Sequence, residues 1–234
     1  MTEKEFINEI LNLDIILNSN QLNQLEKYYE LLVEWNQKIN LTAIIEKEQV
    51  YLKHFYDSLT LNKVIDLDQE LTLVDVGTGA GFPGIVLKIA FPKLKITLLD
   101  SLNKRIEFLK LVIKELDLKD IEAIHARSED YAKENREKYD LATARAVAPL
   151  NILLEYIVPM LKEGGFFLPM KANISQEIIE SKTALKILNS EIITNQEFKL
   201  PKEESIRTIL KIRKSAKTNN KYPRKFSEIK KRPL

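Results

Sequence analysis

A glycine-rich segment between an apolar run and a helix-like stretch limits most strongly how this chain can fold. It reads Val74-Asp75-Val76-Gly77-Thr78-Gly79-Ala80-Gly81-Phe82-Pro83-Gly84 and follows β-forming residues that begin at Leu71. Glycines permit the sharp, positive-φ turn that brings backbone amides close to a ligand, and Pro83 suits the first turn of a helix. The pattern therefore predicts a strand, a nucleotide-cofactor loop and a helix.

A second apolar run, from Lys95 to Asp100, ends in a carboxylate about twenty residues beyond the glycines, as ribose recognition requires. We expect Asp100 to accept hydrogen bonds from ribose hydroxyls. Gly79-x-Gly81-x-x-Gly84 also satisfies the dinucleotide fingerprint. The glycines alone therefore leave NAD or FAD open beside a smaller adenosyl cofactor.

Three observations favour S-adenosylmethionine. Asp75 ends the first strand, where a carboxylate repels a pyrophosphate but can pair with the amino group of a methionine moiety. Phe82 takes the place of the third glycine when the fingerprint starts at Gly77, and its ring crowds a pyrophosphate. Arg127-Ser128-Glu129 follow the third strand candidate, placed to reach an adenine edge.

From Leu71 onward, strand and helix patterns alternate, which predicts a doubly wound α/β sheet. The predicted strands cover residues 71–76, 95–100, 121–126, 139–144, 165–170, 191–197 and 207–213. Helices are expected at residues 104–116, 128–136, 150–161 and 174–188, with Gly164-Gly165 ending the third of them. The late strand pair resembles the antiparallel hairpin of class I methyltransferases, not the second half of a dinucleotide fold.

Apolar residues at helical spacing before the glycine loop predict a small helical subdomain. Two amphipathic helices run through Phe6 to Leu13 and Leu22 to Trp35, the second capped by Ser19 or Asn20, and a third covers Lys47 to Val64. We divide the chain into a helical subdomain at 1–66, a methyltransferase domain at 67–213 and a basic tail at 214–234.

The composition excludes several kinds of chemistry. The chain has no cysteine and two histidines, His54 and His125, so a disulfide, a cysteine-bearing metal site and a thiol nucleophile are excluded, and no metal is expected. Without that nucleophile, methylation of a pyrimidine C5 is disfavoured. Acidic residues near the amino terminus argue against a secretion signal, and no run approaches membrane-spanning length. We expect a cytoplasmic protein.

Positive charge gathers in the last residues, although the net charge is only +2. Lys214 to Leu234 hold eight Lys or Arg residues against one acid, Glu228. Lys221, Arg224 and Lys225 alternate with aromatic residues, which suits phosphate contact and base stacking. The tail is therefore either an RNA-binding element or a disordered, solvated segment.

Arg145 ends the fourth strand, at the edge where ligands bind in this architecture. The residues that follow lack the Asp/Asn-Pro-Pro-aromatic turn with which many methyltransferases hold an exocyclic amine. A ring nitrogen of guanine has an available lone pair, so positioning and charge stabilisation suffice. Arg145 is our candidate catalytic residue.

Taken together, the motifs resemble those of the bacterial small-subunit ribosomal RNA methyltransferase G family, also called glucose-inhibited division protein B, over nearly the whole chain. The resemblance rests on Trp35-Asn36, Asn40-Leu41-Thr42, His54 with Asp57-Ser58-Leu59, Asp75 to Gly84, Leu99 to Arg105, Arg145 to Leu150 and Tyr222-Pro223-Arg224-Lys225. Two departures stand out: Thr78 replaces the usual serine, and Phe226-Ser227-Glu228-Ile229 replaces a stretch that often contains Gly and Pro.

The resemblance implies S-adenosylmethionine-dependent methylation of guanine N7 at position 527 of 16S rRNA, with the small ribosomal subunit as partner and a monomeric enzyme. The predicted cofactor-binding residues are Asp75, Gly77, Thr78, Gly79, Gly81, Phe82, Asp100, Ser101, Ser128, Glu129 and Arg145. Because N7 carries no proton, we expect His54, Asp57 and Asn40 to fix the helical subdomain against the sheet. An NAD-dependent oxidoreductase and a non-catalytic ribosome-assembly factor remain alternatives.

Overall fold

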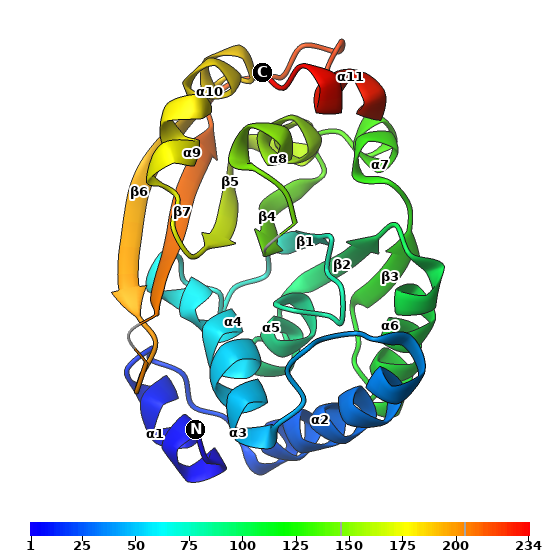
Figure 1. The fold of residues 1–234 in the computed structure, drawn as a ribbon, viewed down its shortest axis with the longest axis vertical. Coiled ribbons are helices and arrows are strands. Elements are labelled where there is room, and N and C mark those ends of the chain that lie inside the picture. Colours follow the sequence, from blue (N-terminus) through cyan, green and yellow to red (C-terminus); the bar gives the residue numbers. More distant parts are fainter. Residues whose placement is uncertain (146, 204) are drawn as a thin grey trace.

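A seven-stranded sheet forms the centre of the computed structural model, which describes residues 1–145, 147–203 and 205–234 (Figure 1). The strands lie in the order β3-β2-β1-β4-β5-β7-β6. The first five pair in parallel, and β7 runs antiparallel to both β5 and β6. Their bounds are β1 (Thr72–Val76), β2 (Lys95–Asp100), β3 (Ile121–His125), β4 (Tyr139–Arg145), β5 (Leu161–Lys171), β6 (Ser190–Lys199) and β7 (Ile206–Lys214). The predicted doubly wound sheet with a late hairpin is confirmed.

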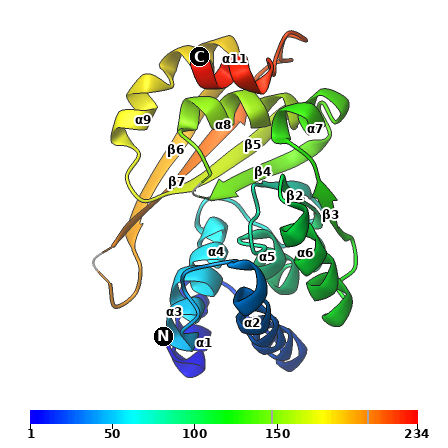
Figure 2. The same ribbon diagram turned by 45° about the vertical axis from the view of Figure 1, so that its right-hand side comes forward.

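Helices cover both faces of the sheet, because successive strand residues point to opposite sides (Figure 2). Leu73 and Leu98 pack into one core, whereas Val74 and Leu99 pack into the other. The first core takes α5 (Gly84–Ala90), α6 (Asn103–Glu115) and the amino-terminal helices. The second takes α7 (Ser128–Glu134), α8 (Leu150–Ile157), α9 (Ser175–Glu180), α10 (Lys182–Ile187) and α11 (Phe226–Lys231).

The predicted amino-terminal helices are present and share the first core with the sheet. Asn18, not Ser19 or Asn20, caps the long helix, because its side chain accepts the Gln21 amide while Gln21 bonds back to the Asn18 amide. The expected third helix is a continuous helical segment of changing pitch. The elements are α1 (Glu3–Leu11), α2 (Ser19–Ile39), α3 (Lys47–Val50), the π-helix η1 (Tyr51–Tyr56), α4 (Asp57–Leu59) and the 3-10 turn η2 (Thr60–Lys63).

Two boundaries differ from prediction. Gly164-Gly165 lie inside β5 rather than at the end of a helix, since α8 stops at Ile157 and the 3-10 turn η3 (Val158–Met160) contains Pro159. Gly164 has φ +81° and sits where the β4–β5 register shifts, so it forms a bulge. The expected helix at 174–188 is two helices that meet at the buried Ser181.

The carboxyl-terminal segment is packed against the second core, unlike the disordered alternative. Tyr222 and Ile229 are buried there. The Arg136 guanidinium donates to the carbonyl oxygens of Tyr222, at 2.5 Å, and Thr218, at 2.7 Å. The sequence pattern did not indicate α11, which lies beside α7 and α8 (Figure 1).

Candidate functional site

A cavity of about 830 Å³ opens at the carboxyl ends of β1 to β4, between the sheet and the amino-terminal helices. Ligands bind at this edge in doubly wound folds, and the volume suits a small-molecule cofactor. The predicted cofactor residues that line it are Gly77, Thr78, Gly79, Phe82, Asp100, Ser101, Ser128, Glu129 and Arg145. Ala146, in the segment after Arg145, lies outside the described residues.

One end of the cavity is organised around Asp100, whose side chain is 3% exposed. Its Oδ2 accepts the Gly79 amide at 3.0 Å and the Arg105 guanidinium at 3.2 Å, and its Oδ1 accepts the Leu102 amide at 2.9 Å. A carboxylate offers about four acceptor positions. One position therefore remains for a ribose hydroxyl, and a second becomes free if Arg105 moves.

The glycine loop depends on Gly79 and Gly84 for different reasons. Gly79 has φ +61°, which places its amide on Asp100. A Cβ atom on Gly84 would lie 2.3 Å from Leu98 Cδ2 and 2.9 Å from Asp75 Oδ2, so glycine lets α5 pack directly on the sheet. Gly81 does not line the cavity, contrary to its predicted role, because it faces Tyr28 and Ile85 in the first core.

Asp75 also lies outside the cavity wall, which differs from the predicted contact with a methionine amino group. The strand ends beneath the loop, so the fully buried carboxylate accepts the Thr78 hydroxyl at 2.6 Å and the Gly84 amide at 2.9 Å on Oδ2. Among the described residues, Asp75 Oδ1 has no hydrogen-bond partner. Burial raises the pKa of Asp75 to about 6. In this arrangement Asp75 supports the loop.

Ser128 and Glu129 lie in the first turn of α7, directly after β3. Both line the same end of the cavity as Asp100, and the Glu129 residue is 4% exposed. Arg127 and Phe226 complete the wall there. This end therefore has the carboxylate and polar groups predicted for an adenosyl moiety, and we call it the adenosine end.

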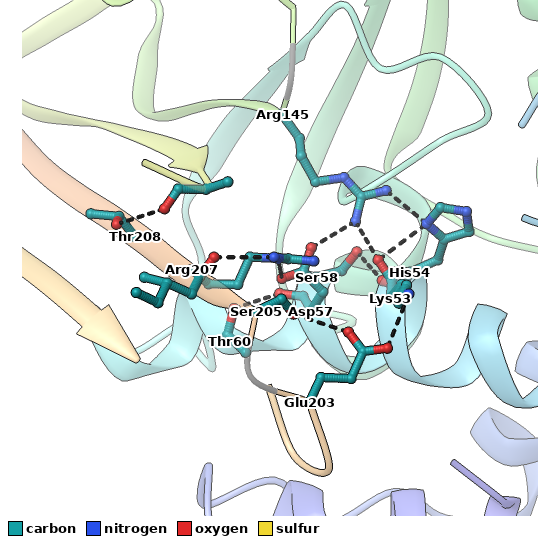
Figure 3. A network of polar contacts seen from close by, with 12 residues as sticks. Lys53, His54, Asp57, Ser58, Thr60, Arg145, Glu203, Ser205, Arg207 and Thr208 are labelled. Carbon is teal, nitrogen blue, oxygen red and sulfur yellow. Dashed lines mark hydrogen bonds and ion pairs between the residues drawn. The ribbon is translucent and has the colours of Figure 1, made fainter. Parts of the chain in front are cut away.

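At the opposite end, a charge network joins α4 to β4 and β7 around the buried Asp57 (Figure 3). Arg145 Nη1 donates to Asp57 Oδ2 at 3.0 Å and to the Lys53 carbonyl at 3.1 Å. Arg207 Nε lies 3.3 Å from Asp57 Oδ1. Burial raises the pKa of Asp57, and the two guanidinium groups oppose that rise. We call this the methyl end, because the predicted catalytic residue Arg145 lies here.

His54 is held as a neutral ring in the same network. Its ring stacks on Phe82 with centroids 4.4 Å apart, and Arg145 lies over the same phenyl ring at 5.2 Å. Burial, with a smaller contribution from the Arg145 charge, lowers the pKa of His54 to about 3. His54 Nδ1 lies 3.1 Å from the Lys53 carbonyl oxygen, to which it can donate, and 3.3 Å from Arg145 Nη2, from which it can accept in the other tautomer. Nε2 lies 3.0 Å from the Thr42 hydroxyl.

His54 and Asp57 thus connect the helical subdomain to the sheet, as expected, whereas Asn40 has a different role. Asn40 ends α2 in a left-handed conformation with φ +46°. The sequence interpretation missed Lys53 and Arg207, which line the methyl end. Lys53 pairs with Glu203 at 3.0 Å. No local motif marks these residues, because their partners come from distant parts of the chain.

Arg224 does not have the free guanidinium expected of a phosphate contact. Its Nη2 lies 2.6 Å from Oε2 of Glu155, a side chain with no exposed surface, and its Nε donates to Oε1 at 2.8 Å. The charge thus compensates a buried carboxylate and anchors the carboxyl-terminal segment. Lys221 and Lys225 are exposed.

The residues of the cavity fit S-adenosylmethionine. Asp100 keeps acceptor capacity for the ribose, and Glu129 adds a second carboxylate to the wall of the same cavity. Within the described residues, no group of three His, Cys, Asp or Glu side chains is placed to hold a metal ion, and no helix is long and apolar enough to cross a membrane.

The fold and this cavity define a class I S-adenosylmethionine-dependent methyltransferase. Two solved structures share the fold: M. jannaschii TYW2 in complex with AdoMet (TM-score 0.53, 17% identity, 66% of this chain and 76% of that one) and a SAM-dependent methyltransferase from Aquifex aeolicus (TM-score 0.51, 18% identity, 71% and 93%).

Within that class, the chain belongs to the rRNA small subunit methyltransferase G family, whose model matches residues 21–207. Ribosomal RNA small subunit methyltransferase G of Staphylococcus carnosus is 48% identical over 225 residues, covering 94% of each chain. The protein of that name from Streptococcus sanguinis is 49% identical over 239 residues, covering all of both chains.

Proposed function

We propose that this enzyme transfers a methyl group to N7 of the guanine at position 527 in 16S rRNA of the bacterial small ribosomal subunit. Family membership supports an rRNA acceptor. The observation that carries the choice of atom is the state of the methyl end. There the imidazole is neutral and hydrogen-bonded, and the carboxylate is paired with two arginines. Guanine N7 needs no deprotonation, so it matches a methyl end whose described residues offer no free general base.

When bound, the cofactor supplies an electrophilic methyl group. The chain's own residues must then hold the guanine with N7 unobstructed. Guanine presents O6 and N7 as acceptors on one edge. Arg145, fixed over Phe82 by Asp57 and the Lys53 carbonyl, is suited to donate to O6 while leaving N7 free. Holding two reactants in line contributes about 7 to 11 kcal/mol to lowering a bimolecular barrier.

Cations around the methyl end are suited to the RNA backbone. Lys53 and Arg207 line the cavity and keep 31% and 22% of their side chains exposed. RNA phosphates attract such side chains through long-range electrostatics. We assign RNA contact to these two residues in addition to the exposed Lys221 and Lys225. Arg207 contacts Asp57 through Nε alone, at 3.3 Å, whereas the Arg224 guanidinium donates to both Glu155 oxygens, so Arg224 is left out of that set. The proposed enzyme acts as a cytoplasmic monomer.

The test is methyl transfer from radiolabelled S-adenosylmethionine to small subunits isolated from a strain that lacks this gene, followed by mapping of N7-methylguanine. We expect a single modified guanine at position 527. Subunits from the parent strain are the control, since their site is already methylated. Cofactor binding without transfer to either substrate would contradict the proposal and favour a non-catalytic assembly factor.

The assignment of Lys53 and Arg207 to the RNA interface has its own test. Lys53→Ala and Arg207→Ala should each weaken rRNA binding. Each should also reduce the slope of log K against log salt concentration by about one, because one counterion fewer is released. Lys93→Ala is the matched control, because Lys93 is exposed and pairs with Asp68 on another part of the surface. An unchanged salt dependence in both variants would show that Lys53 and Arg207 do not belong to the RNA interface.

A further inference from the structure

The adenosine end contains an aromatic side chain that neither the sequence motifs nor the proposed chemistry uses. Phe226, the first residue of α11, lines the cavity with Ser128 and Glu129 and is 41% exposed. Large aromatic side chains gain free energy when they leave water, so an exposed ring in a ligand cavity is a surface that a ligand can cover.

Arg127 supports the Phe226 ring. The Arg127 guanidinium carbon lies 5.1 Å from the ring centroid, within cation–π distance. Arg127 directly precedes α7 and is itself exposed. A ring held between a guanidinium and an open cavity has one face available for stacking.

The backbone on both sides of Phe226 is fixed in place. Two residues earlier, Arg224 binds the fully buried Glu155 through its guanidinium and through its own amide at 2.9 Å. Three residues later, Ile229 is completely buried in the second core. The ring is therefore exposed although its position is set, and a ligand that covers it loses little backbone entropy of the protein.

The order of the strands indicates which part of the cofactor reaches this ring. Asp100, the last residue of β2, is the predicted ribose-binding residue, and Arg145, the last residue of β4, marks the methyl end. In the sheet order β3-β2-β1-β4, β3 lies beyond β2 and away from β4. Arg127 follows β3 in the chain and contacts Phe226, so the pair lies beyond Asp100 and away from Arg145. The base of an adenosyl cofactor extends from the ribose in that direction.

We propose that Phe226, backed by Arg127, stacks on the adenine ring of the bound cofactor, so that the carboxyl-terminal segment completes the cofactor site. Because the purine ring has a π-face, the contact is stacking rather than a specific hydrogen bond. The inference rests on the methyltransferase cofactor and not on the identity of the RNA acceptor. An unpaired RNA base has the same stacking chemistry, and the test separates the two sources.

The test measures dissociation constants by calorimetry for S-adenosylhomocysteine and for adenosine, without RNA, in the full-length chain. Phe226→Ala should weaken both ligands by about tenfold, because the lost contact is to the shared adenine. Phe226→Trp should restore the affinity by supplying another flat ring. Lys230→Ala, an exposed change on the same helix, is the control and should leave both constants unchanged.

An affinity of Phe226→Ala for S-adenosylhomocysteine within twofold of the wild type would overturn the proposal. If that variant then bound an rRNA fragment more weakly, the ring would belong to the RNA site. If the wild-type chain did not methylate small subunits, the proposed function would be contradicted, but this binding measurement would be unaffected. Thermal melting of each variant separates a lost contact from a displaced segment.

Discussion

At the adenosine end of the cavity, the predicted binding groups follow the carboxyl ends of the neighbouring strands β1, β2 and β3, whereas the charged groups of the methyl end come from α4, β4 and β7. Asp100 and Glu129 lie within four residues of a strand end. Arg145, Asp57 and Arg207 meet although at least 62 residues separate neighbouring members of the set in sequence.

The two ends also differ in how far their polar groups are already paired. Asp100 retains acceptor capacity for a ligand, while both oxygens of Asp57 face guanidinium groups. A paired, buried network keeps its geometry before the substrate arrives. The adenosine end is therefore suited to gain contacts from a ligand, whereas the methyl end holds Arg145 in one position.

The largest effect is expected at the methyl end. Arg145→Ala leaves Asp57 buried with Arg207 as its remaining ion-pair partner, so the free energy of unfolding should fall by about 3 kcal/mol. Methyl transfer should fall by about 10²- to 10³-fold, because a positioned donor is lost. Urea unfolding and single-turnover methylation measure the two effects. Adenosine affinity, measured as the control, should stay within twofold of the wild type.

A double variant sharpens this result. In Arg145→Ala/Asp57→Ala the buried carboxylate is gone together with its partner, so part of the stability should return while methyl transfer stays low. A double variant that is no more stable than Arg145→Ala would show that the unpaired carboxylate is not the source of the loss.

Arg224→Ala tests whether the carboxyl-terminal segment, which contributes Phe226 to the adenosine end, also depends on a buried ion pair. Glu155 has no exposed surface, and the change removes its guanidinium partner, so we expect a loss of about 3 kcal/mol in unfolding free energy. Lys225→Ala, at the exposed neighbouring position, should change stability by less than about 0.5 kcal/mol. Equal stability of the two variants would mean that Arg224 does not anchor the segment.

Asp75 lies beneath the loop between the two ends, and its pH dependence tests that position. Burial raises its pKa in the folded protein to about 6, above the ordinary value of 3.8, so its contribution to stability is present below pH 3.8 and lost as the pH rises through 6. Between pH 4 and pH 7.5 the wild type should lose roughly 2 kcal/mol relative to Asp75→Asn. Urea unfolding at both pH values measures this, and parallel pH profiles would contradict it.

Asp100→Ala tests the adenosine end directly. Loss of the ribose acceptor should weaken cofactor binding by about 2 kcal/mol, or roughly 30-fold, while turnover at saturating cofactor changes less. Asp100→Asn is the matched control, since it keeps the shape and one acceptor oxygen. If Arg145→Ala weakened adenosine binding as much as Asp100→Ala does, the division of the cavity into two ends would be wrong.

The smallest effect concerns His54, for which we expect no change. Because its pKa is lowered to about 3, its imidazole signals in a proton NMR titration should stay constant between pH 5 and pH 8. The neutral form is thus maintained at the methyl end across this range. A titration step for His54 in that window would show that the ring gains a proton beside Arg145 and would contradict the lowered pKa.

Much of the fold was predictable because its signals are local. Every strand was located, β2 with the observed bounds, since buried runs and turn residues mark strands directly. Two predictions were wrong: the helix end at Gly164 and the single helix across Ser181. Glycine can end a helix or form a bulge in a strand, and helical spacing continues across a break between two short helices. Gly164 forms a bulge because β4 sets the register of β5, and that pairing depends on residues far away in sequence.

The sequence by itself determined the sheet, the glycine loop and the carboxylate at the end of β2, because each is encoded within a short stretch of chain. Only the tertiary structure decided that Asp75 and Gly81 support the loop from beneath, that Arg224 neutralises Glu155, and that Phe226 reaches the cavity. These roles depend on burial and on partners that folding brings together. The type of a side chain determines neither how deeply it is buried nor which residues it contacts.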